Sequence, residues 1–181
     1  MWETVFAPCA PGPVSSAAEL DRAEAELGFP LPESYRTFCL SLGAGLANGY
    51  FRVAIPSIDP ETDLVGRSEL MAHSIASVLA ERVDHRFEVE GDDPSVIERA
   101  GFFGQTEAGA FLFWDVVPGR DEYEIWVLDA DLESIRFGGA DLVDLMRRSR
   151  GAAVRGILGM GAAPLPTAFV GDGTEGAAGL H

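Results

Sequence analysis

The clearest hydrophobic pattern in the chain lies between residues 31 and 42. Apolar side chains recur there at spacings of three and four, which places them on one face of a helix; they are Leu31, Tyr35, Phe38, Cys39 and Leu42. Pro32 suits the first turn of a helix, and Glu33 lies at the positive end of the helix dipole. The spacing therefore predicts a helix over residues 32–42 that buries this face in a core.

Other patterns predict the remaining elements. Ser16 and Glu19 have the spacing of a capping box and Gly28 follows Leu27, so a first helix is expected over residues 16–27. Further runs predict a strand at 50–55, a helix at 67–83, a short helix at 94–100, strands at 110–117, 123–128 and 134–137, and a helix at 140–150. Successive strands usually pair antiparallel, so the order favours an α+β fold in which helices surround one mostly antiparallel sheet.

The chain of 181 residues suits one domain. Residues 1–14 contain three prolines and are expected to form an irregular leader. The domain is expected over residues 15–150. Residues 151–181 contain eight glycines, so we expect a Gly/Ala-rich extension whose last part, 171–181, is disordered.

The charge of the chain restricts its partners. There are 29 acidic residues and 13 basic ones, all of them arginine, which gives a net charge of −16. Such a charge repels nucleic acids and anionic membranes, so direct binding to either is not expected. It favours attraction to a basic protein, and it equally suits a protein that is acidic only for solubility.

The composition of the N-terminal segment indicates where in the cell the protein is located. No basic residue precedes the first apolar stretch, which is unlike a secretory signal, and no stretch is long and apolar enough to span a membrane. The two cysteines, Cys9 and Cys39, have no metal-ligand spacing. We expect a cytoplasmic protein that holds no metal and no cofactor.

Catalytic motifs are not evident. His73 and His85 do not have the spacing of metal ligands, no serine lies in a GxSxG turn, and no lysine is present for Schiff-base or phosphate-loop chemistry. The strongest polar group is a set of carboxylates at strand ends; it comprises Asp115, Asp129, Asp131 and Glu133, with Asp121, Glu122 and Glu124 at the predicted hairpin. These residues indicate either an acidic docking face or, less readily, a divalent-metal site.

Two tryptophans are further candidates. Trp114 and Trp126 fall on neighbouring predicted strands, where they could stack across the sheet. Two interpretations are open. Either both tryptophans pack in the core, or one of them is exposed as a binding anchor, since tryptophan is frequent in binding hot spots. A basic partner would then meet an acidic face with an aromatic residue in it.

Several short motifs, in order, resemble the SUKH superfamily. Glu26-Leu27-Gly28 matches its "ELG", Leu31-Pro32 its "LP", and Tyr35 and Phe38 its helix aromatics. Asn48-Gly49 stands near its Asn-Gly-Gly, with Tyr50 in place of the second glycine. Later pieces also follow the family pattern: they are Phe103-Gly104, Gly109, Phe113-Trp114-Asp115 and Ile125-Trp126-Val127. Two segments depart from the family pattern: an acidic insert at residues 84–93, whose weak pattern suits either a loop or an edge strand, and the C-terminal extension.

The resemblance implies an α+β domain of SUKH type with a binding function and no enzymatic activity. The superfamily includes bacterial toxin-immunity proteins, which implies a chain that binds and neutralises a cognate toxin. The net charge of −16 favours a basic toxin, such as one that acts on nucleic acid. A regulatory or scaffold protein like the cell-wall-synthesis regulators is the alternative, and a carboxylate-based metal-dependent hydrolase is a third. The tentative partner face comprises Asp121, Glu122, Glu124, Trp126, Asp129, Asp131 and Glu133; the sequence leaves the oligomeric state open.

Overall fold

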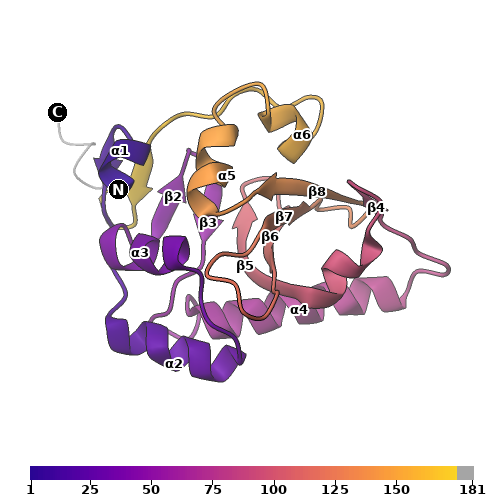
Figure 1. Cartoon of the computed structure of the whole chain (residues 1–181), viewed down its shortest axis with the longest axis horizontal. Helices are drawn as coiled ribbons and strands as arrows, with labels where there is room; N and C mark the ends of the chain where they lie inside the picture. The colour runs from indigo at the N-terminus through magenta and orange to yellow at the C-terminus, as the bar shows by residue number, and fades with distance from the viewer. Residues whose placement is uncertain (175–181) are drawn as a thin grey trace.

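The computed structural model describes residues 1–174 and shows helices packed around one nine-stranded, mostly antiparallel sheet (Figure 1). The strand order across the sheet is β1-β9-β2-β3-β5-β6-β7-β8-β4. The helices are α1 Trp2–Val5, α2 Ala17–Leu27, α3 Glu33–Ser41, α4 Leu64–Ala80, the 3₁₀ helix η1 Pro94–Arg99, α5 Leu142–Arg148 and α6 Val154–Leu158. The strands are β1 Cys9–Ala10, β2 Gly45–Ala47, β3 Phe51–Val53, β4 Glu88–Val89, β5 Ala100–Thr106, β6 Phe111–Asp115, β7 Ile125–Leu128, β8 Ser134–Gly139 and β9 Phe169–Gly171. The α+β prediction is confirmed.

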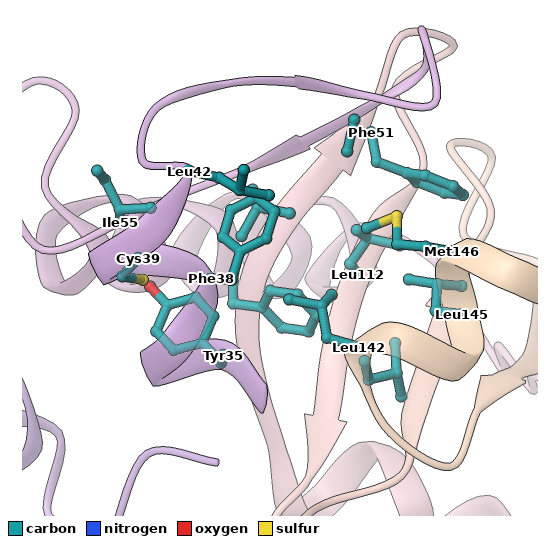
Figure 2. Packing of buried hydrophobic residues seen from close by; sticks show 14 of the residues in the cluster. Tyr35, Phe38, Cys39, Leu42, Phe51, Ile55, Leu112, Leu142, Leu145 and Met146 are labelled. Atoms are coloured by element: carbon teal, nitrogen blue, oxygen red, sulfur yellow. The ribbon is translucent and has the colours of Figure 1, made fainter. Parts of the chain in front are cut away.

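Local signals determine the first two long helices. The side chain of Ser16 accepts a hydrogen bond from the Glu19 N–H and the side chain of Glu19 accepts one from the Ser16 N–H, so the predicted capping box is present. Gly28 ends α2 in the left-handed conformation, at φ 81°. The predicted apolar face of α3 is buried and packs with Leu145 in one core, as Figure 2 shows.

The sheet has a core on each side because its side chains alternate. On β6, Leu112 and Trp114 point to the core under α1, α2, α3 and α5, whereas Phe113 points to a second core under α4. Met71 and Ile75 of α4 cover that second side. Among the residues 1–174 that the structure describes, no helix is long and apolar enough to cross a membrane.

The sequence patterns missed several strands, among them three that share one feature. The segments that form β2, β5 and β9 all contain glycine, which weakens the strand signal. Gly104 of β5 is required by close packing, since a Cβ there would lie 2.8 Å from the carbonyl oxygen of Arg52. The pair Gly138-Gly139 was predicted to end the last strand, yet β8 continues through it. A Cβ on Gly139 would lie 2.6 Å from the backbone nitrogen of Leu145, so the glycine allows α5 to pack against the strand.

The predicted character of the two end segments needs correction. The leader is not irregular, because α1 and β1 lie within residues 1–14 and Trp2, at 1% exposure, belongs to the main core. The extension adds an internal strand next to the edge of the sheet, since β9 pairs with both β1 and β2. Residues 171–174 of the segment predicted to be disordered are ordered, and the rest of it lies outside the described residues. Both terminal segments complete the sheet.

Candidate protein-binding surface

The acidic insert forms the outermost strand of the sheet. β4 runs parallel to β8, with Glu88 opposite Ser134 and Val89 opposite Ile135. The Glu88 N–H donates to the carbonyl oxygen of Glu133 at 2.8 Å, and the Glu90 N–H donates to that of Ile135 at 2.9 Å. The pairing brings the insert against the β7–β8 turn, so two acidic segments that are separate in sequence become neighbours. We call the acidic side chains of residues 84–93 and 129–133 the acidic edge.

Most carboxylates of the acidic edge face solvent. Seven of its eight acidic residues are exposed, namely Asp84, Glu88, Glu90, Asp92, Asp93, Asp131 and Glu133. The eighth, Asp129, is half-buried and accepts a 2.7 Å bond from Nη1 of Arg136. Arg82 contributes a weaker counter-charge, 3.6 Å from the Glu133 carboxylate. Because exposed ion pairs contribute little and leave the field of their neighbours in place, the edge remains negative.

The predicted hairpin carboxylates lie elsewhere, because β7 separates them from the acidic edge. Glu122 is held inside the fold: its carboxylate accepts bonds from the Ser34 N–H at 2.6 Å and the Ser34 hydroxyl at 2.8 Å, at the start of α3. Burial raises the pKa of the Glu122 carboxyl, and the bonds from Ser34 oppose that rise. Asp121 is exposed and Glu124 is half-buried. The seven predicted residues therefore do not form one continuous face.

The two tryptophans do not stack on each other. Trp114 lies opposite Ile125, not Trp126, and the two indoles point to opposite sides of the sheet. Trp114 is buried, stacked on Phe103 with ring centroids 4.3 Å apart. Trp126 is half-buried and meets Phe137 edge-on at 5.5 Å. Core packing thus explains the position of Trp114, whereas neighbouring residues cover the side chain of Trp126 only in part.

The predicted carboxylates do not gather at one site, because ion pairs and turn hydrogen bonds hold them in different places. Asp115 accepts two bonds from Arg99, at 2.6 and 3.1 Å. Asp131 accepts from the Glu133 N–H at 3.0 Å, as the side chain of a turn. Across residues 1–174 no group of three or more His, Cys, Asp or Glu side chains could hold a metal ion.

A groove of about 600 Å³ was not predicted from the sequence. It lies between the loop that follows β3, the start of α4 and the sheet, and its apolar lining includes Val14, Ile58 and Met71. Arg67 lies in it with Nη2 3.2 Å from Oε1 of Gln105. No sequence signal identifies this groove, because six separate segments contribute to its lining.

Comparison with known proteins gives one family. No curated protein and no solved structure matches the chain. Residues 15–148 match the sequence model of the SMI1 / KNR4 family (SUKH-1), which is most of the chain. The matched range runs from the cap of α2 to the end of α5 and contains both long acidic segments. The chain therefore belongs to the SMI1 / KNR4 family (SUKH-1).

Proposed function

We propose that this chain is a non-enzymatic immunity protein that binds and neutralises a cognate basic toxin acting on nucleic acid. The family includes both immunity proteins and cell-wall regulators. One observation favours the first role: the pairing of β4 with β8 joins two acidic segments into one exposed edge. A toxin that binds nucleic acid carries a basic groove, and an exposed carboxylate surface is complementary to it.

The local charge supports this use of the acidic edge. Residues 84–93 and 129–136 contain eight acidic residues and two arginines, a net charge of −6 within a chain of net charge −16. The pairing of β4 with β8 fixes the backbone of Glu88 and Val89, so this part of the edge needs little backbone reorganisation on binding. An anionic surface of this kind raises the association rate with a cationic partner by about 10–10³-fold.

The test begins with affinity capture of the partner from the source cell and identification by mass spectrometry. The captured protein is then expressed in a host cell with and without this chain, and growth is measured. Expression alone should stop growth, and co-expression should restore it. Capture of a partner that is harmless when expressed alone would support the regulatory or scaffold role instead.

Two matched variants locate the contact. The edge-reversed variant carries Glu88→Arg and Glu133→Arg, and the hairpin-reversed variant carries Asp121→Arg and Glu124→Arg, with the same change in net charge. The edge-reversed variant should lose protection, whereas the hairpin-reversed variant should retain most of it. Equal protection by both variants would place the contact away from the acidic edge.

A further inference from the structure

The C-terminal part of the chain is basic, in contrast to the rest. From residue 145 to residue 171 there is no aspartate or glutamate, while four arginines occur. They lie at the end of α5 and in α6, and we call them the basic face: Arg147, Arg148, Arg150 and Arg155. None of them is within 4.0 Å of a carboxylate in residues 1–174, although six other arginines are. In the part of the chain that the structure describes, this surface is thus left without ion pairs despite the many acidic residues.

Two of these arginines are held in place by neutral groups. Arg148 donates from Nη1 to the Gly138 carbonyl oxygen at 2.8 Å and lies 4.9 Å above the ring of Phe137. Arg150 donates to Oδ1 of Asn48 at 3.3 Å and lies 5.2 Å from the ring centroid of Phe6. Burial, together with the charge of Arg147, lowers the pKa of Arg150. Arg147 and Arg155 are exposed. Two of the four positive charges are therefore pre-positioned by neutral groups, and within residues 1–174 no carboxylate pairs with them.

Of the basic face, Arg155 lines the same groove of about 640 Å³ as the acidic edge. Glu88, Glu90 and Asp92 form what we call the acidic wall of this groove, and Arg155 forms its basic wall; Arg136, which is paired with Asp129, also lines it. Met160 also lines the groove and is 81% exposed, so an apolar side chain is available for contact there. The two walls do not form ion pairs with each other across this groove.

We propose that this surface is the interface of a two-fold symmetric dimer with a second copy of the chain. An anionic ligand alone would fit the basic face but would be repelled by the acidic wall beside it, and a cationic ligand would meet the reverse problem. A two-fold rotation about the groove brings each acidic wall against the partner's basic wall, so every contact is made twice. A second copy satisfies both walls at once.

The inference does not depend on the proposed toxin. It concerns the free protein, and it implies that self-association and binding of a basic partner compete for the acidic edge. The dimer would then be a resting form in which the second copy covers the carboxylates of the acidic edge until a more strongly basic partner displaces it.

The test is sedimentation velocity of the full chain, whose monomer mass is 19.3 kDa. At about 0.05 M salt the chain should sediment as a dimer, and at about 1 M salt, where the Debye length is about 3 Å, it should dissociate. Glu88→Arg and Arg155→Glu should each weaken the dimer about tenfold or more, since each change acts at two symmetric contacts. The swapped variant with both changes should recover most of that loss.

Arg120→Glu, at an exposed arginine in the β6–β7 connection, is the control and should leave the dimer intact. A wild-type monomer at low salt overturns the inference, and so does a dimer that Glu88→Arg and Arg155→Glu leave unchanged or that the swap fails to restore. Failure here is separable from failure of the proposed function. The swapped variant regains self-association, yet its altered edge should still bind a basic toxin more weakly than wild type.

Discussion

Nδ2 of Asn48 donates a 2.9 Å hydrogen bond to the carbonyl oxygen of Met146, which ties the turn between β2 and β3 to the last turn of α5. Asn48 is fully buried and its φ is +52°, in the left-handed region that asparagine tolerates better than most residues. Its Oδ1 also accepts the two bonds from Arg150. The family-like Asn-Gly pair in this chain thus has a structural role that connects three parts of the fold.

Replacing Asn48 should therefore destabilise the whole domain. Asn48→Ala removes the hydrogen bonds to the Met146 carbonyl and from the Arg150 guanidinium. It also places alanine, which has no polar side chain to compensate, at a positive φ. The free energy of unfolding should therefore fall by about 3 kcal/mol or more. Urea denaturation measures it. Asn48→Gly removes the same bonds but accepts the positive φ, so it should cost less than Asn48→Ala. Equal stability of the alanine variant and wild type would contradict the bonding described.

Phe38 is the centre of the aromatic packing under α3. It is fully buried and contacts Trp2 edge-on at 5.2 Å and Phe169 at 5.7 Å. Phe38→Ala should lower the free energy of unfolding by about 3–5 kcal/mol, because it leaves a cavity between three elements. The exposed Leu40 on the same helix is the control, and Leu40→Ala should change the thermal midpoint little. A Phe38→Ala midpoint close to that of wild type would contradict the packing.

The parts of the fold that the sequence predicted are those set by local patterns. The face of α3 and the capping box of α2 depend on residues within a few positions of one another, so they can be read from the chain. The strand β9 depends instead on pairing with β2, more than 120 residues away, and its three residues show no alternation to detect. The helix α1 is likewise stabilised by distant contacts, such as the 3.0 Å bond from Nε1 of Trp2 to Oγ1 of Thr37.

The same distinction applies to the binding surface. The two acidic segments are visible in the sequence, but their union into one edge follows from β4 pairing with β8, which a two-residue strand does not signal. Glu122 was placed on the partner face because it lies among other carboxylates. Its bond to Ser34, 88 residues away, shows a structural role that only the tertiary structure reveals.

The partly buried Glu122 predicts a pH dependence. Its folded pKa is raised above 4.5 by burial, so the folded state holds the proton more tightly than the unfolded state does. The stabilisation that Glu122 contributes to the folded state is fully present below its unfolded pKa and is lost as the pH rises through its folded pKa. The free energy of unfolding of wild type, minus that of Glu122→Gln, should therefore fall as the pH rises from about 3 to about 7. A difference that increases over this range would show that the bonds from Ser34 outweigh burial.

Association with the proposed basic partner should depend strongly on salt if the acidic edge steers the encounter. The field of exposed carboxylates extends about 8 Å at physiological salt and about 3 Å at 1 M, so the association rate constant should fall as salt is added. The dissociation rate constant should change much less, because short-range contacts control it. Stopped-flow kinetics with the captured partner, across a salt series, measures both constants.

The two reversed variants make this prediction specific to one surface. Both change the net charge by the same amount, so a general effect of net charge would slow association equally for the two. Steering by the acidic edge requires instead that the edge-reversed variant associates more slowly and with a smaller salt dependence than the hairpin-reversed one. An association rate constant indifferent to salt, or an equal response of both variants, would contradict steering and leave the charge of −16 as a contribution to solubility.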